Sequence, residues 1–386
     1  MSKVLVMESS YENCNEAMDR AFSAFPLDMA GKRVVIKPNA LKPCNPDTDT
    51  AMVTHYKILE AVIKKVETLG PREILVGDSV GTEFYGRSDE VCSEVRFKEV
   101  AGPYYTNMSK NLRKVKLTHP FEREVAVLAD VLDAEVYISL PKMKTHGLTM
   151  TSGGIKNNYG LLSGAQKSWY HYYAITPERF ARILMEMFRL RPPDLVIMDA
   201  VLAMAGYGPA SPLTYPVNKI LASDDAAALD TVEAEMIGFK PEQVPLLMLA
   251  REFGLGETRL QNIRVEGEAA TIPGYPKPEE PPEASYAYKA GVGTGSTSRL
   301  YYRERVAFRP VIDARKCRFN RGCTDCVAVC PTQALVSGKS TPGLNRDQCI
   351  LCSACKEVCD HAALELLPDP EIMDQLQAAE ESGVPS

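Results

Sequence analysis

The chain carries eleven cysteines, and eight of them lie in two runs that nearly repeat each other. The first run contains Cys317, Cys323, Cys326 and Cys330, and the second contains Cys349, Cys352, Cys355 and Cys359. The second run has the C-x2-C-x2-C-x3-C spacing by which a short loop holds a [4Fe–4S] cluster. The first run differs by three additional residues between its first two cysteines. Thiolates are soft ligands that suit iron–sulfur iron, so the spacing indicates one-electron transfer.

The fourth cysteine of each run is expected to ligate the cluster of the other run, as in two-cluster ferredoxins. The predicted sets are Cys317, Cys323 and Cys326 with Cys359, and Cys349, Cys352 and Cys355 with Cys330. Zinc sites need one tetrahedral set with longer spacers, and disulfides are typical of small secreted domains, so both alternatives are disfavoured. Residues 318–322 lengthen the first loop. A three-iron cluster at the set with Cys317 therefore stays an alternative to a four-iron one.

A second group of reactive side chains lies in residues 140–164, LPKMKTHGLTMTSGGIKNNYGLLSG. Small residues let backbone N–H groups approach an anion, and nearby lysines neutralise its charge. We therefore predict an anion or cofactor site that contains Lys37, Asn39, Lys142, Lys144, Thr151, Ser152, Gly153, Gly154 and Asn157. His146 and Lys156 are the candidate catalytic residues. A flexible polar loop with solvated lysines is the alternative.

Polar residues also follow other predicted strands. Asp78, Ser79 and Asp199 stand at strand ends, where open α/β sheets bind their ligands, so one shared crevice is predicted. Each of them could cap a helix instead. The segment SWYHYY contains the only tryptophan, and Trp169 or Tyr170 is a hypothetical stacking wall for a flat ring, with His171 beside it. Packing of these aromatic residues in the core is the alternative.

The elements that must position these residues alternate along the first 265 residues. Strands are predicted at residues 3–7, 33–37, 73–76, 136–140, 195–198 and 219–222, and helices at 11–22, 55–69 and 225–237. This alternation is typical of an α/β fold with a mainly parallel sheet and flanking helices. The repeated cysteine runs predict an additional small α+β domain of the two-cluster ferredoxin type.

Composition divides the chain into four predicted parts. Residues 1–265 form the α/β domain, and residues 266–305, rich in Pro, Gly, Ser and Glu, form a linker or surface arm. Residues 306–367 form the two-[4Fe–4S] domain, and residues 368–386 are an acidic tail that is a docking helix or a frayed end.

Net charge and cysteine content narrow the possible functions and the expected cellular compartment. A net charge of −6 and a pI near 5.6 disfavour nucleic-acid binding, which usually needs a basic surface. The first residues contain no apolar run long enough for a signal peptide or a membrane span. Thiols that are kept for iron fit a reducing compartment, so we expect a cytoplasmic protein.

Five segments of the first 265 residues resemble the domain-of-unknown-function 362 family. They are VVIKPNALKP (34–43), LVGDSVG (75–81), LPKMKTHGLTMTSGGIKNNYG (140–160), PDLVIMDAVLAMAGYGPA (193–210) and LASDDAAALDTVEAEMIG (221–238). Members of this family often carry a fused two-cluster ferredoxin module, which the cysteine runs match. Residues 223–225, Ser-Asp-Asp, stand where a Gly-Thr-Asp-Pro-like turn is common. The resemblance implies an iron–sulfur redox protein, with a flavin as its candidate partner cofactor.

Two functions follow from these observations. The first is an iron–sulfur oxidoreductase that passes electrons between two [4Fe–4S] clusters and a second site in the α/β domain. FMN or another flavin at that site would join one-electron transfer to two-electron chemistry. No G-x-G-x-x-G motif follows a strand, which disfavours a nicotinamide cofactor. The second function is a non-catalytic electron relay that docks onto a partner redox enzyme. Either function needs a redox partner protein or a small-molecule electron acceptor.

Overall fold

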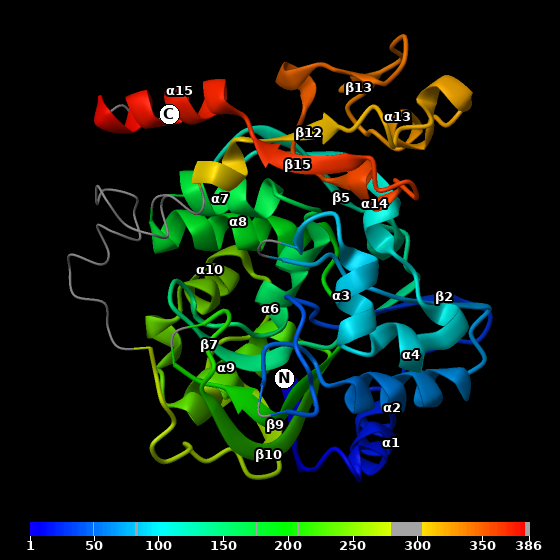
Figure 1. Ribbon diagram of the computed structural model, residues 1–386. Helices are drawn as coiled ribbons and strands as arrows, with labels where there is room; N and C mark the ends of the chain where they lie inside the picture. The colour runs from blue at the N-terminus through cyan, green and yellow to red at the C-terminus, as the bar shows by residue number, and fades with distance from the viewer. Residues whose placement is uncertain (49, 82–83, 175, 207, 279–302, 383–386) are drawn as a thin grey trace.

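The computed structural model describes residues 1–48, 50–81, 84–174, 176–206, 208–278 and 303–382. Figure 1 shows a large α/β body that contains the N-terminus, with a smaller cysteine-bearing module stacked on one end of it. Residues 279–302 of the predicted linker lie outside the described residues.

The core of the α/β body is a nine-stranded sheet. Its main path runs β11-β1-β10-β9-β6-β2-β3, and β7 and β8 extend it beside β9. Strand β2 pairs in parallel with β3 and β6, and β6 and β7 pair in parallel with β9. The carboxyl ends of these strands therefore meet at one end of the sheet. The strands are β1 (Ser2–Glu8), β2 (Arg33–Lys37), β3 (Glu73–Val76), β6 (Val136–Ser139), β7 (Lys142–His146), β8 (Met150–Thr151), β9 (Leu195–Met204), β10 (Thr214–Ser223) and β11 (Ile263–Glu266).

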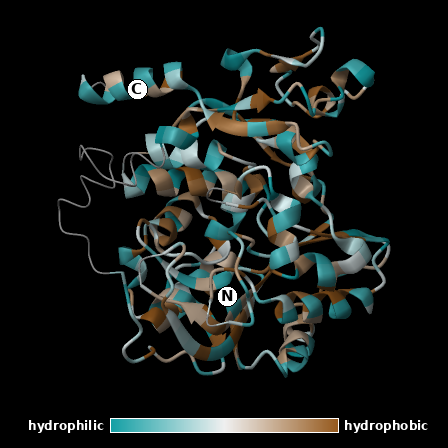
Figure 2. Ribbon diagram, viewed as in Figure 1, coloured by the Kyte–Doolittle hydropathy of each residue, from teal (hydrophilic) through white to brown (hydrophobic). Residues whose placement is uncertain are grey.

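Alternate residues of the buried strands pack into hydrophobic layers on the two faces of the sheet. In β2, Val34 and Ile36 lie in one layer, while Val35 packs on the opposite face with Tyr137. Helices α1 (Cys14–Ala24) and α2 (Tyr56–Glu67) cover the first face, and α8 (Pro177–Leu190), α9 (Ala226–Ile237) and α10 (Pro245–Phe253) cover the other. In Figure 2 most helices carry both colours, as helices with one buried face should.

Shorter elements connect this framework. They are α3 (Ser88–Glu94), α4 (Phe97–Ala101), α5 (Ala129–Leu132), α6 (Gly154–Asn157), α7 (Gln166–Tyr173) and an antiparallel hairpin of β4 (Leu112–Leu117) and β5 (Arg123–Leu128). None of the helices in the described part of the chain combines the length and apolar character that a bilayer crossing requires.

The fold class predicted from the sequence is confirmed, since the sheet is mainly parallel and has helices on both faces. The predicted strands at residues 33–37 and 73–76 coincide with β2 and β3. The sequence did not predict that β10 pairs antiparallel with both β1 and β9, nor the hairpin of β4 and β5. An apolar run reads the same in either direction, so periodicity alone cannot orient a buried strand.

The cysteine module is small and antiparallel. Strand β12 (Phe308–Ile312) pairs with β15 (Leu364–Pro368), and β13 (Leu335–Val336) pairs with β14 (Gly343–Leu344). The single-turn helices α13 (Asp325–Ala328) and α14 (Ala354–Glu357) occupy corresponding places in the two cysteine runs. The acidic tail forms α15 (Pro370–Glu381), whose Leu376 is buried against Val306 and Ala307.

Candidate functional site

The eight cysteines of the module line two separate cavities. Cys330, Cys349, Cys352 and Cys355, called the inner quartet, line the cavity that faces the α/β body, with Ala165 of that body in its wall. Cys317, Cys323, Cys326 and Cys359, called the outer quartet, line the second cavity. The fourth cysteine of each run thus stands with the three cysteines of the other run, which is the crossed grouping that the spacing predicts.

The longer loop of the first run does not displace its cysteines. Phe319–Arg321 forms a single 3-10 turn, and Gly322 follows it in the left-handed region at φ 95°. This turn returns the chain to Cys323, so that Cys317 lines the cavity together with the rest of the outer quartet. The sequence alone left the position of Cys317 open.

The residues around both quartets fit iron–sulfur clusters. All eight thiols are free of disulfides, and aliphatic side chains such as Leu335, Leu344 and Leu364 line the cavities beside them. Within the described ranges, no three Cys, His, Asp or Glu side chains converge closely enough to hold a single metal ion. A four-iron cluster holds its thiolates farther apart than a single zinc ion does. The quartets are therefore compatible with two [4Fe–4S] clusters.

The inner quartet is bound directly to the α/β body. The Ser163 hydroxyl donates a 3.0 Å hydrogen bond to the backbone oxygen of Cys352. Gly164 has φ +65°, and a Cβ atom built there would lie 2.5 Å from the same oxygen. Ala165 packs in a hydrophobic cluster with Tyr85 and Leu351. The module could not approach this closely if residue 164 carried a side chain.

A buried carboxylate forms a second contact between the module and the body. Glu357 at the end of α14 accepts hydrogen bonds from the Ser88 hydroxyl at 2.6 Å, from the Ser88 backbone N–H at 3.1 Å and from Asn107 Nδ2 at 2.9 Å. Burial raises the pKa of Glu357, although these donors oppose the shift. The contact therefore fixes the second cysteine run on the body.

A lysine-rich pocket of about 80 Å³ lies at the carboxyl ends of the parallel strands. Lys37 ends β2, Asp78 follows β3, and Lys144 lies in β7. Lys156 of α6 and Lys167 of α7 complete the charged lining. In the described lining, four lysines therefore surround one carboxylate, in the crevice where open α/β sheets bind ligands. We call this site the lysine pocket; its remaining lining residues are Asn39, Ala40, Leu41, Ser79, Gly81, Ser152, Asn157, Tyr159, Gly160 and Pro209.

Of the four lysines, Lys37 alone pairs with a carboxylate of the described lining, Asp78, at 2.7 Å. The Lys167 Nζ donates to the backbone oxygens of Ser79 and Val80, both at 2.8 Å, and to the Ser79 hydroxyl at 2.9 Å. Lys144 donates to Asn39 Oδ1 and to the backbone oxygen of Met52. These acceptors are uncharged, so they hold the amines in place without neutralising them.

Lys156 differs from the other lysines because no described residue forms a hydrogen bond or ion pair with its amine. Burial lowers its pKa to about 8. Burial also lowers the pKa of Lys167 to about 7, and burial together with the charges of Lys156 and Lys142 lowers that of Lys144. Amines that titrate near neutral pH can exchange protons with a ligand.

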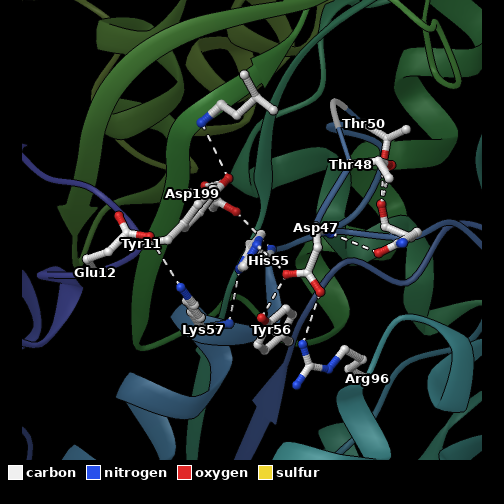
Figure 3. A network of polar contacts seen from close by, with 12 residues as sticks. Tyr11, Glu12, Asp47, Thr48, Thr50, His55, Tyr56, Lys57, Arg96 and Asp199 are labelled. Carbon is white, nitrogen blue, oxygen red and sulfur yellow. Dashed lines mark hydrogen bonds and ion pairs between the residues drawn. The ribbon is translucent and has the colours of Figure 1, made fainter.

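Lys142, which the sequence assigns to the same site, lies in a different network. Its Nζ is 2.8 Å from Asp199 Oδ2 and donates to the Tyr11 hydroxyl at 2.9 Å. The other oxygen of Asp199 accepts from Tyr11, and the ring of Tyr11 stacks on His55 with centroids 3.7 Å apart. Figure 3 shows Tyr11, His55 and Asp199 facing one another. The charge of Lys142 is thus compensated, and neither Lys142 nor Asp199 lines the lysine pocket.

The backbone that follows Gly153 does meet an acidic side chain, but that side chain belongs to the protein. The backbone N–H groups of Gly154 and Ile155 donate to Asp230 of α9, at 2.6 and 2.9 Å. Gly153 lies so close to Asp230 that a Cβ atom would be 2.1 Å from its Oδ1. These amides are therefore occupied, and Gly153 and Gly154 do not line the pocket.

His146 and Thr151 also lie outside the pocket lining. His146 is 2% exposed, and its Nδ1 accepts a 3.0 Å hydrogen bond from the Leu148 backbone, which stabilises the turn after β7. Of the predicted site residues, the structure gathers Lys37, Asn39, Lys144, Ser152, Lys156 and Asn157. The sequence does not predict Lys167, because it lies three residues beyond the Gly-rich segment 140–164, in an aromatic-rich helix.

The predicted aromatic wall is largely packed in the core. Tyr170 is 1% exposed, and Trp169 contacts Tyr170 and Phe121 edge to face. The guanidinium of Arg123 lies 4.0 Å above the ring of Trp169. Trp169 also borders an open groove of about 800 Å³ that reaches Cys349.

Comparisons with known proteins identify the large domain. A family model described as "Domain of unknown function (DUF362)" matches residues 34–235. The thylakoid-associated protein sll1697 of Synechocystis sp. is 30% identical over 241 residues, which is 59% of this chain and 70% of that protein.

The cysteine-rich region has a separate relative. Pyruvate synthase subunit PorD of Thermotoga maritima is 34% identical over 68 residues, which is 17% of this chain and 66% of that protein. Among solved structures, the lactate racemase apoprotein of Thermoanaerobacterium thermosaccharolyticum aligns with a TM-score of 0.37 and 14% identity, over 60% of this chain and 56% of that one. At that TM-score the likeness implies nothing about activity.

Proposed function

This chain belongs to the DUF362 family, whose description leaves its activity open, and we propose that it is an iron–sulfur oxidoreductase. The quartets would hold two [4Fe–4S] clusters. Electrons would pass between the inner quartet and a compound bound in the lysine pocket, and a redox partner would exchange them at the outer quartet.

One short segment carries this proposal, because it borders both sites. Ala165 lines the cavity of the inner quartet, and Lys167, two residues later, lines the lysine pocket. Two residues along a chain are at most about 7 Å apart at Cα. Electron transfer through protein slows steeply with distance, so this contact favours exchange between the two sites.

Each group of residues has a separate task. The eight thiolates would ligate the clusters, which when bound supply one-electron transfer. Ser163 and Glu357 hold the inner quartet against the α/β body. Lys156, with a pKa of about 8, would exchange a proton with the bound compound as its charge changes.

Metal and sulfide analysis of protein purified without oxygen tests the assignment. We expect about eight iron and eight sulfide atoms per chain, and a broad absorption near 400 nm that dithionite bleaches. About seven irons per chain would indicate a three-iron cluster at the outer quartet. Iron at or below about one atom per chain, or zinc in its place, would contradict the proposal.

A non-catalytic relay is the second candidate function, and the match to pyruvate synthase subunit PorD favours it. In that case the α/β body recognises a partner redox enzyme, and the lysine pocket has no reacting ligand. Replacement of Lys156 by Gln would then leave every electron-transfer rate unchanged. In the oxidoreductase it abolishes only the reaction at the pocket, while dithionite still reduces the clusters.

A flavin is a further candidate for the second centre. The groove beside Cys349 has room for one, and Arg123, Arg309, Trp169 and Tyr173 line it. Release of FMN or another flavin on denaturation would support this placement, and a colourless supernatant would contradict it.

We propose that the protein is cytoplasmic, since thiols stay reduced in that compartment. Because the Synechocystis relative is named as thylakoid-associated, cell fractionation is the test of this localisation.

A further inference from the structure

The lysine pocket holds more amines than the carboxylates of its described lining can pair. Among the described residues that line it, Asp78 is the single carboxylate, and it pairs with Lys37 at 2.7 Å. Lys144 and Lys167 are 3% and 6% exposed, and their hydrogen-bond acceptors are neutral oxygens. Buried charges without counter-ions are costly, and proteins usually pair them. The neighbouring Lys142 follows that rule with Asp199.

From this imbalance we propose that the lysine pocket binds a small oxyanion with two negative charges, either a short dicarboxylate or a phosphate. The inference deepens the proposed function, because it names the class of compound that meets the inner quartet, and in that sense it rests on that function. A bound anion favours the protonated form of each buried amine. With all four amines protonated, one negative charge on the ligand would leave the pocket positive, whereas two charges balance most of it.

Two polar groups are free to contact the ligand. The amine of Lys156 has no partner among the described residues, and the Ser152 hydroxyl, also in the lining, is buried without one. The amines of Lys37, Lys144 and Lys167 are held by their own hydrogen bonds. We assign direct contact to Lys156 and Ser152. Lys144 and Lys167, which lack a carboxylate partner in the described lining, supply the surrounding positive field.

The size of the pocket limits the ligand. A water molecule needs roughly 10–15 Å³ of such space, so about 80 Å³ accepts an anion of only a few heavy atoms. Gly160 keeps this space open, since a Cβ atom there would lie 2.4 Å from Lys37 Nζ and 2.7 Å from Asp78 Oδ1. A flavin ring does not fit this volume, which separates the pocket from the groove beside Cys349.

Calorimetric titration of the full, cluster-loaded chain at pH 7 and low salt tests the inference. Oxalate and inorganic phosphate are the two probes, and acetate is the singly charged control. We expect at least one dianion to bind at least ten times more tightly than acetate. Preference for oxalate identifies a dicarboxylate ligand, and preference for phosphate identifies a phosphate.

Variants then locate the binding. Lys156→Gln should weaken the favoured dianion roughly 10- to 100-fold, and Ser152→Ala several-fold, because each removes a hydrogen bond to a charged group. Lys64→Gln, on the exposed face of α2, should leave binding unchanged. Absence of dianion binding, equal binding of acetate, or full affinity in Lys156→Gln would overturn the inference.

Iron content distinguishes this inference from the function on which it rests. Dianion binding by protein that carries no iron would support the pocket and contradict the oxidoreductase. Eight irons without dianion binding would support the two clusters and contradict the proposed class of ligand. Thermal unfolding of each variant shows whether a loss of binding reflects a loss of folding.

Discussion

The inner cysteine quartet and the lysine pocket lie on the two sides of residues 163–167, and burial shifts the pKa values of their thiols and amines in opposite directions. Burial and neighbouring thiols raise the pKa of Cys352 and of Cys355, while burial lowers the pKa of Lys156 and of Lys167. Both sites gather groups that would carry the same charge when ionised. Each site therefore suits a ligand of opposite charge. The thiols suit a cationic iron centre, and the amines suit an anion.

The two sites also differ in how the chain assembles them. The quartets come from 43 consecutive residues, and short loops bring their thiols together. The lysine pocket collects Lys37, Asp78, Lys144 and Lys167 from strand ends and helices that are far apart in sequence. A local site survives when its own module folds, whereas a non-local site needs the whole sheet. The predictions below test this difference.

Removal of one inner thiol should have the largest effect. Cys355→Ala takes a ligand from the inner quartet, so iron should fall from about eight atoms per chain to about four, or to none if the module unfolds. The lysine pocket should keep its affinity for the dianion, because its residues belong to the α/β body. Iron analysis and calorimetry measure the two outcomes.

The control for this variant is Cys44→Ser, a free cysteine of the α/β body. It should keep all the iron. Full iron in Cys355→Ala would contradict the assignment of the inner quartet.

A side chain at the junction of the two regions should separate them. Gly164→Ala places a Cβ atom 2.5 Å from the Cys352 oxygen and imposes left-handed strain, so we expect a loss of about 2–4 kcal/mol in unfolding free energy. Urea unfolding, followed at 400 nm and by circular dichroism, measures the loss.

Gly31→Ala is the matched control, since φ is +69° there and no atom lies within 4 Å of its Cβ position. It should cost only about 1 kcal/mol. Equal losses of unfolding free energy in the two variants would mean that close contact at residue 164 does not stabilise the module.

Affinity for oxalate should fall as the pH rises. Lys156 and Lys167, with pKa values of about 8 and 7, are cationic at pH 6 and neutral at pH 9 in the free protein. Asp78, Lys37 and Glu357 also act on Lys167. Bound oxalate stabilises the cations, so the dissociation constant should increase by up to about tenfold per pH unit for each amine above its free pKa.

Calorimetry between pH 6 and 9 measures this dependence. Oxalate keeps its two charges over that range, so only the protein titrates. Lys156→Gln should flatten the profile above pH 8. Affinity that rises with pH would contradict cationic amines as the binding groups.

The smallest effect is expected at the buried carboxylate of the junction. Glu357→Gln keeps the shape of the side chain but weakens hydrogen bonds from Ser88 and Asn107, so the module should lose about 1 kcal/mol of stability. Glu365→Gln, which removes an exposed ion pair with Lys356, should cost under about 0.5 kcal/mol. Thermal unfolding at 400 nm compares them, and a larger loss in Glu365→Gln would oppose this view of the junction.

The same local and non-local difference explains what the sequence could predict. The cysteine spacing predicts three ligands of each cluster because each loop is short and these ligands are near neighbours. The crossed fourth ligand is predicted from the pattern of two-cluster ferredoxins. Lys37, Asn39, Lys144 and Lys156 were predicted because they follow strands or lie near glycines. Lys167 follows no strand and lies beyond the Gly-rich segment, in α7. Its place in the pocket depends on the packing of α7 against Ser79.

Lys142 and Gly154 are two of the predicted residues that lie outside the pocket, and residues elsewhere in the chain account for their contacts. Lys142 does not reach the pocket with Lys144, because Asp199 of β9 lies beside Lys142 and pairs with it. The amides of Gly154 and Ile155 cannot bind an external anion, because they donate to Asp230 of α9. Tertiary pairing of this kind depends on sheet order, and local sequence does not encode that order.

A potentiometric titration tests most directly whether the two sites communicate. The reduction potential of each cluster is measured by electron paramagnetic resonance, with and without saturating oxalate, in the wild type and in Lys156→Gln. Negative charge in the pocket disfavours an added electron nearby, so the potential of the inner cluster should fall by an amount on the order of tens of millivolts. That of the outer cluster should stay constant, and Lys156→Gln should abolish the shift. Identical potentials with and without oxalate in wild-type protein that binds it would contradict electron exchange between the inner quartet and the lysine pocket.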